Sequence, residues 1–164
     1  MSEQLTKAIE KFWDDRPCNI KHSKKPVGQK EYFNEVEARK YFVEPHIPKF
    51  AEFEKWSGLD VLEIGCGIGT DSINFVRNGA NLDIIELSGK SLDICKKRFS
   101  VFGLSANFYK NNALGIYSGT KILLKNAFIA LLESKDFTYS NEENNSTDLM
   151  KNSLSFIPAL NEMP

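Results

Sequence analysis

Apolar and polar positions along the first third of the chain follow a helical period interrupted by prolines. Apolar side chains recur every three or four positions in "LTKAIEKFW", which predicts an amphipathic helix over residues 2–13. The next stretch, "RPCNIKHSKKPVGQ", holds two prolines, one glycine and five basic side chains, so it is predicted to be a loop. Further helices are predicted over residues 29–44 and 48–57, bounded by Pro45 and Gly58.

The period changes after Gly58. Continuous apolar runs predict buried strands, and helical patterns lie between them and end at glycines. The predicted order is strand, helix, strand, helix, strand, over residues 59–64, 70–79, 81–87, 88–103 and 106–110. This alternation predicts an α/β fold built from right-handed βαβ units around a parallel sheet.

The last third has a weaker pattern. The stretch "SGTKILLKNAFIALLESK" predicts a helix over residues 118–135. The following 26 residues, from Tyr139 onward, are rich in asparagine and serine and show no strand period, so we expect the chain beyond about Ser140 to be loosely ordered. Only three strands are then expected, and an incomplete sheet would leave an edge through which the chain could self-associate.

Composition narrows the classes of partner. At 164 residues, with 41% hydrophobic and 26% charged residues, the chain has the size and composition of one globular domain. Its net charge of −1 gives no reason to expect nucleic acid as a partner. Three cysteines without a C-x-x-C pair argue against a disulfide framework, and Cys18 with His22 is too little for a metal site, so we expect no metal and a cytoplasmic location. The chain shows neither a signal peptide at its start nor an apolar run long enough to span a membrane.

A glycine-rich turn, "VLEIGCGIGT", follows the first predicted strand. A turn from strand to helix presents backbone N–H groups at the edge of the sheet where ligands of α/β proteins bind, and glycines let a ligand approach. The mononucleotide-phosphate loop needs a lysine that is missing here, so that ligand class is nearly excluded. The dinucleotide fingerprint fits imperfectly, because the glycines are Gly65, Gly67 and Gly69 and Thr70 takes the sixth place.

The same turn resembles the E/D-x-G-x-G-x-G signature of class I S-adenosylmethionine-dependent methyltransferases, of the small-molecule, type 11-like kind. "IIELS" resembles the second motif of that family, and 21 positions separate Gly65 from Glu86, close to the spacing at which a second-strand carboxylate meets a ribose. The resemblance implies a Rossmann-like three-layer sandwich with an N-terminal helical cap. It also implies S-adenosylmethionine as cofactor, bound by Glu63, Gly65, Cys66, Gly67, Gly69, Thr70, Glu86, Leu87, Asn112 and Ala113.

The resemblance covers about residues 29–113 and then ends, because no segment matches the fourth strand and active-site loop of the family. It implies a cap at residues 1–57, a cofactor-binding half at 58–113 and a divergent tail at 114–164. We therefore expect methyl transfer to a small-molecule acceptor, with catalytic residues that the sequence does not reveal. Two alternatives stay open: a fragment of such an enzyme that binds cofactor without catalysis, and a nicotinamide-dependent oxidoreductase, against which Thr70 counts.

Overall fold

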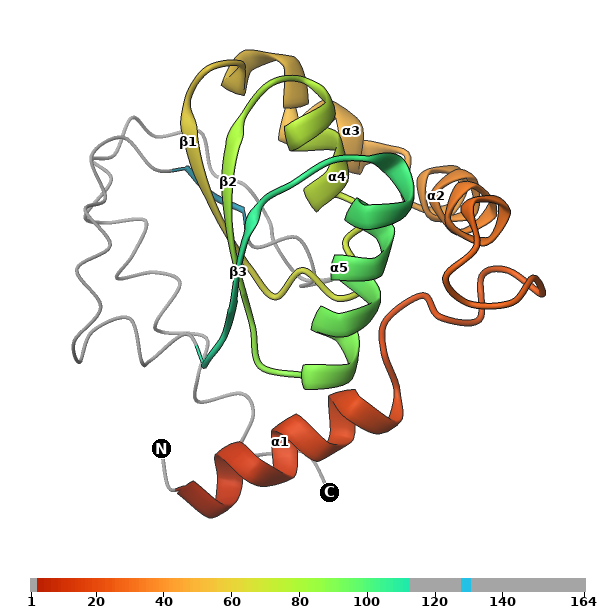
Figure 1. Cartoon of the computed structure of the whole chain (residues 1–164), viewed down its shortest axis with the longest axis vertical. Helices are drawn as coiled ribbons and strands as arrows, with labels where there is room; N and C mark the ends of the chain where they lie inside the picture. The colour runs from red at the N-terminus through yellow and green to blue at the C-terminus, as the bar shows by residue number, and fades with distance from the viewer. Residues whose placement is uncertain (1–2, 113–127, 131–164) are drawn as a thin grey trace. The chain divides into compact units, whose positions relative to one another are not determined.

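A parallel β-sheet forms the centre of the part of the chain that the structure describes. The computed structural model describes residues 3–112 and 128–130. Within these, four strands pair in parallel in the order β3-β2-β1-β4 (Figure 1). The strands are β1 (Asp60–Ile64), β2 (Asn81–Glu86), β3 (Asn107–Lys110) and β4 (Phe128–Ala130). The predicted α/β class and the three predicted strands are confirmed.

The central strands are buried along most of their length, as expected for a parallel sheet covered by helices. In β1 and β2 the first residue is exposed, and nearly every later residue is buried. Glu63 of β1 is in register with Ile84 of β2, and Ile64 with Ile85. Because the register is unbroken, the two strands end side by side at the same edge of the sheet.

Helices α4 (Ser72–Arg77) and α5 (Gly89–Phe102) cover one face of the sheet (Figure 1). Each follows a strand and leads to the next strand on the same side, so right-handed crossovers place both on the same face. Ser88 caps α5 by accepting a hydrogen bond from the Ser91 N–H at 3.0 Å, and Gly103 ends it with φ +68°. Phe99 of α5 packs edge-to-face on Phe108 of β3, which anchors the helix on the sheet.

Helix α2 (Lys30–Val43) packs on α5 and supplies a second apolar cluster of Tyr32, Phe33 and Val36 with Ile68. The short helix predicted over residues 48–57 differs in detail from the one observed. The chain forms α3 (His46–Ala51) and then a separate 3₁₀ turn, η1 (Phe53–Trp56), because Glu52 adopts φ +44° between them. A residue with positive φ cannot continue a right-handed helix.

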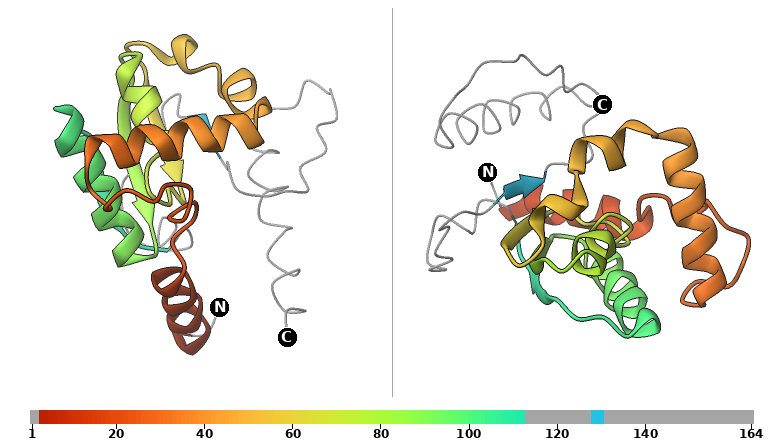
Figure 2. Two further views of the ribbon diagram at one scale, coloured as in Figure 1. Left: turned by 90° about the vertical axis from the view of Figure 1, so that its right-hand side faces the viewer. Right: turned by 90° about the horizontal axis from the view of Figure 1, so that it is seen from above.

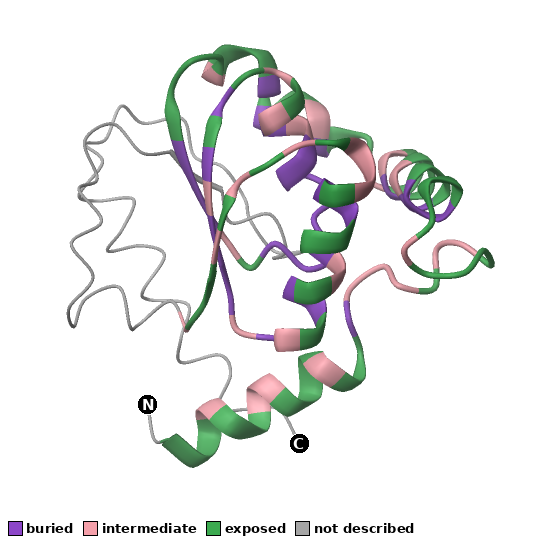
Figure 3. Ribbon diagram, in the orientation of Figure 1, coloured by how far each residue is buried: buried purple, intermediate pink, exposed green. Residues whose placement is uncertain are grey.

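Helix α1 (Glu3–Asp15) matches the helix predicted over residues 2–13 and extends two residues beyond it. It has no buried residue, whereas α2 carries a buried stripe (Figure 3). Figure 2 shows α1 from two further directions. It contacts α5, where Asp14 accepts hydrogen bonds from the Ser88 hydroxyl and the Lys90 N–H, and β3, where Glu10 pairs with Lys110.

The predicted helix over residues 118–135 is wrong at its centre. Phe128–Ala130 form β4, which pairs with β1 in the register Val61↔Phe128, so the sheet has a fourth strand where three were predicted. The predicted loose order beyond Ser140 lies outside the described residues. All of the described residues fall within one compact unit, Met1–Glu133. None of the described helices is long and apolar enough to cross a membrane.

Candidate functional site: the glycine loop at the end of the first strand

Residues 65–71 form a loop that links β1 to α4 at the carboxyl edge of the sheet. Two positions of this loop are glycine for different physical reasons. Gly69 has φ +75°, and a Cβ there would lie 2.4 Å from the Cys95 sulfur, so glycine lets the loop pack on α5. Gly65 has φ +80°, is exposed, and would bring a Cβ near no other atom. The Gly65 N–H donates to the Ile85 carbonyl at 2.8 Å, which fixes the start of the loop. The open space beside Gly65 is therefore available to a ligand.

Glu86, the last residue of β2, points its carboxylate at this loop. Its Oε2 accepts a hydrogen bond from the Gly67 N–H at 2.9 Å, and its Oε1 accepts one from the Ser88 N–H at 2.8 Å. The side chain is 7% exposed. The register of β1 and β2 brings these two segments together, as the sequence predicted from the shared strand edge.

Burial raises the pKa of Glu86 above its ordinary value, and the N–H donors of Ser88 and Gly67 act in the opposite direction. The carboxylate thus carries a desolvation cost that two backbone N–H groups offset in part. Each carboxylate oxygen has a second lone pair, so Glu86 can accept further hydrogen bonds from a ligand hydroxyl.

A cavity of about 150 Å³ lies beside Gly65 and Glu86. Its lining combines the glycine loop, the end of β2, α5 and the N-terminal segment: Trp13, Cys18, Gly65, Gly67, Glu86 and Ser91. Sites for small organic ligands are typically about 300–1,000 Å³. The cavity therefore holds part of such a ligand while Trp13 and Cys18 stay in place.

Helix α1 is held over this site by acidic side chains. Asp14 Oδ1 accepts from the Ser88 hydroxyl at 2.7 Å and from the Lys90 N–H at 3.1 Å, at the N-terminus of α5. These two donors lower the pKa of Asp14, which is half-buried. Glu10 forms an ion pair of 2.7 Å with Lys110 at the end of β3. The polar contacts of Asp14 and Glu10 therefore position Trp13 at the cavity, and water can replace these contacts.

A buried polar network that sequence reasoning missed supports the other end of the loop. Lys40 of α2 forms an ion pair with Asp71 at 2.5 Å, and the two side chains are 5% and 4% exposed. The Tyr41 hydroxyl donates to Asp71 Oδ1 at 3.0 Å, and burial raises the pKa of Tyr41 far above its ordinary range. Asn74 Nδ2 donates to Tyr41 Oη at 2.9 Å and to the Thr70 carbonyl at 3.0 Å. The network ties α2 to the loop and to α4.

Three other predicted site residues, Glu63, Cys66 and Thr70, are buried in the protein. Glu63 is 2% exposed within β1 and does not line the cavity. A hydrogen bond with Cys95, together with burial, raises the pKa of Cys66 well above that of a free thiol, so Cys66 is a neutral packing residue and not a thiolate nucleophile. Thr70 is buried, and its hydroxyl has no hydrogen-bond partner among the described residues.

Three further predicted residues follow the ends of β2 and β3. The Leu87 backbone N–H is one of the groups that oppose the rise in the pKa of Glu86 caused by burial. Asn112 is partly buried just beyond β3, with its N–H donating to Asn111 Oδ1 at 2.8 Å. Ala113 lies outside the described residues. Over the described part of the chain no group of three or more His, Cys, Asp or Glu side chains could hold a metal ion.

No family model and no curated protein matches the chain. Among the solved structures that resemble it are several S-adenosylmethionine-dependent methyltransferases. Magnesium protoporphyrin IX methyltransferase (ChlM) from Synechocystis PCC 6803, with bound SAM, is 16% identical over 65% of this chain and 54% of that chain, with a TM-score of 0.47. The plantazolicin methyltransferase BpumL, in complex with SAH, is 16% identical over 72% of this chain and 46% of that chain, with a TM-score of 0.37. The chain thus spans about half the length of each.

Proposed function

We propose that the chain binds S-adenosylmethionine at the glycine loop and transfers its methyl group to a small-molecule acceptor. The observation that carries the proposal is the juxtaposition of Glu86 and the loop: the second-strand carboxylate bonds the Gly67 N–H and lines one cavity with Gly65. A carboxylate there can accept hydrogen bonds from both hydroxyls of a ribose, and these charge-assisted bonds are strong. The open backbone at Gly65 leaves room for the amino-acid portion of the cofactor.

Methyl transfer requires mainly that the protein hold the reacting groups in the correct positions. When bound, with its ribose held by Glu86 and its amino-acid portion beside Gly65, the cofactor would supply an electrophilic methyl group on a sulfonium. Holding such groups in line can supply several kcal/mol of rate enhancement without a catalytic dyad. The roles left to this chain are to orient the ribose through Glu86 and to keep the loop rigid through Asp71.

We infer that α1 moves to admit the cofactor, within a cap that comprises residues 1–57. The cavity of about 150 Å³ is smaller than a site for a whole nucleoside ligand, and Trp13 of α1 is part of its wall. Because α1 buries no residue, it can leave at low cost and return over the bound ligand.

Isothermal titration with S-adenosylhomocysteine and with NAD tests the assignment. We expect the first to bind and the second not to bind. Glu86→Gln should weaken S-adenosylhomocysteine at least about tenfold, since hydrogen bonds to a charged group are each worth about 1.5–3 kcal/mol. Asp83→Asn is the matched control, because Asp83 lies on the same strand and bonds Asn107 instead of the loop. Tighter NAD binding would indicate a nicotinamide-dependent oxidoreductase and would overturn the proposal.

The pH dependence sharpens the role of Glu86. Its pKa is raised above the ordinary 4.5 in the ligand-free protein, and ribose hydroxyl donors favour the ionised form. Ligand binding therefore releases a proton, and affinity should fall as the pH is lowered from 7.5 toward 5. In Glu86→Gln the affinity should be flat over this range. An identical pH profile in the two proteins would remove Glu86 from the site, while circular dichroism checks that both are folded.

A further inference from the structure

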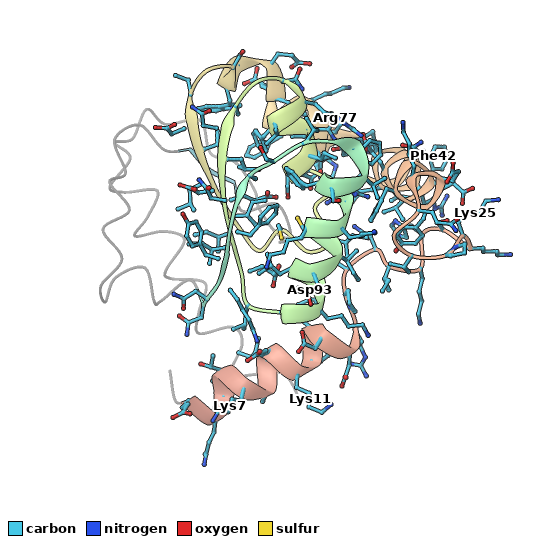
Figure 4. All side chains as sticks on the ribbon, in the orientation of Figure 1. Lys7, Lys11, Lys25, Phe42, Arg77 and Asp93 are labelled. Atoms are coloured by element: carbon cyan, nitrogen blue, oxygen red, sulfur yellow. The ribbon has the colours of Figure 1, made fainter. Side chains whose placement is uncertain are left out.

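A second hollow lies outside the glycine-loop cavity, between the loop after α1 and the outer side of α5. Its volume is about 370 Å³, which is within the range of small-molecule sites. The residues that line it are Ile20, Val27, Gly28, Lys90, Asp93, Ile94 and Lys97. We call this hollow the α5 groove. Figure 4 labels Asp93, one of these lining residues, on α5.

The walls of the α5 groove are apolar. Ile20, Val27 and Ile94 line it, and Val27 is 49% exposed although it is aliphatic. Gly28 has φ +96°, and a Cβ there would lie 3.4 Å from Lys97 Cγ, so the glycine brings the loop against the aliphatic stem of Lys97. An apolar part of a ligand in this groove would be shielded from water by the loop on one side and by α5 on the other.

The charges at the rim favour an anion. Two of the three charged lining residues are lysines, and the Lys97 ammonium makes no ion pair or hydrogen bond with any residue in the described part of the chain. Asp93, four positions before Lys97 on α5, is the one acidic residue among those that line the groove. Lys97 is left as a cation beside an apolar wall.

We propose that the α5 groove binds a small amphipathic carboxylate, with its apolar body against Ile20, Val27 and Ile94 and its anionic end at Lys97. The size of the groove favours a small molecule over a helix of a partner protein, and the two lysines against one aspartate favour an anionic head group over a cationic one.

The α5 groove adjoins the glycine-loop cavity. On α5, Ser91 lines the cavity and Ile94, one helical turn later, lines the groove. On the loop after α1, Cys18 lines the cavity and Ile20 lines the groove. If the chain transfers methyl groups as proposed, the ligand of the α5 groove is the methyl acceptor. Only this assignment of the ligand rests on the proposed function. The binding of an amphipathic carboxylate does not depend on that function.

Titration with decanoate, followed by calorimetry and by backbone amide NMR shifts, tests the proposal. We expect saturable binding below the micellar concentration, with shifts confined to residues 18–29 and to α5. Decyltrimethylammonium, which has the same chain and the opposite charge, should bind at least about fivefold more weakly, as should acetate, which lacks the apolar body.

Two variants on α5 form a matched pair. Lys97→Glu should weaken decanoate at least about fivefold, whereas Lys96→Glu, an exposed neighbour that does not line the groove, should leave it unchanged. Val27→Asp, at an exposed position, should weaken binding without loss of folding. Equal effects of Lys97→Glu and Lys96→Glu, shifts centred elsewhere, or tighter binding to phosphatidylserine vesicles than to decanoate would overturn the proposal. Decanoate binding in a protein that binds no S-adenosylhomocysteine would support the groove and refute the proposed methyl transfer.

Discussion

Helices α1 and α2 have nearly the same length, 13 and 14 residues, yet they are held to the rest of the fold by different forces. Helix α2 buries Tyr32, Phe33, Val36 and Lys40, and its buried ion pair reaches the glycine loop. Helix α1 buries no residue, and its lysines Lys7 and Lys11 extend outward from it (Figure 4). One helix is part of the core, and the other is a cover held by surface contacts.

The difference assigns them different tasks. A site that binds by positioning needs a loop whose backbone does not move, and the Lys40–Asp71 pair supplies that rigidity from α2. The same site needs an entrance, and a helix held by Asp14 and Glu10 can open without disturbing the core. Substitutions in α2 should therefore change global stability, and substitutions in α1 should change local opening and ligand kinetics.

The largest effect is expected at Asp71. Asp71→Ala leaves the Lys40 ammonium buried without its carboxylate, which should lower the free energy of unfolding by about 3–5 kcal/mol. Urea denaturation measures this loss. Lys7→Ala removes the exposed pair with Glu3 on α1 and should cost less than about 1 kcal/mol.

A double variant separates the loss of the charge pair from simple disruption of packing. Lys40→Met combined with Asp71→Leu replaces the buried pair by apolar groups and should retain more stability than Asp71→Ala alone. If Asp71→Ala lowers the free energy of unfolding no more than Lys7→Ala does, then α2 is attached no more firmly than α1.

A smaller effect is expected at Trp13, where α1 meets the cavity. Trp13→Ala should speed the dissociation of S-adenosylhomocysteine about three- to tenfold, because the wall of the cavity is removed, while the free energy of unfolding changes little. Stopped-flow dissociation measures the rate. Phe12→Ala is the control, since Phe12 packs edge-to-face on Trp13 at 5.1 Å but does not line the cavity. Equal rates in the two variants would show that α1 is not the cover of this site.

The order of strands and helices along residues 59–110, and the place of Glu86 at the end of the second strand, could be predicted because both follow from local period. Apolar runs between glycine-terminated helices give βαβ units, and parallel strands then end at a common edge where Glu86 meets Gly67. Strand β4 could not be predicted this way. Its three residues lie inside the apolar run "ILLKNAFIALL", which fits a buried helix as well as a strand. Pairing with β1, a long-range interaction, decides the outcome there.

Polar contacts between distant segments were beyond the reach of the sequence. Asp71 and Lys40 are 31 positions apart, and Asp14 and Ser88 are 74 positions apart, so no local period links them. One signal was present for Lys40, which follows Tyr32 and Val36 at intervals of four on the buried face of α2. A lysine in that register requires a buried carboxylate, and Asp71 provides it.

The smallest effect is expected at Asp14, which holds α1 to the N-terminus of α5. Asp14→Asn removes the charge from the hydrogen bonds with Ser88 and Lys90, so amide hydrogen exchange in α1 should become about two- to fivefold faster at pH 7. Global stability should not change. Asp15→Asn is the matched control, because Asp15 is the next residue on α1 and, within the described part of the chain, pairs with Lys11 of the same helix. Equal exchange in both variants would contradict a specific role for Asp14.

The pH dependence of the same contact follows from its lowered pKa. The Ser88 hydroxyl and the Lys90 N–H hold the pKa of Asp14 below its ordinary 3.8, so the charged contact is fully formed above that value and is lost only as the pH falls through the lower folded-state value. Exchange in α1, corrected for the intrinsic rate, should therefore be constant between pH 5 and 8. A loosening of α1 with a midpoint inside this range would mean that a group other than Asp14 fastens the cover, and α1 would then respond to pH where α2 does not.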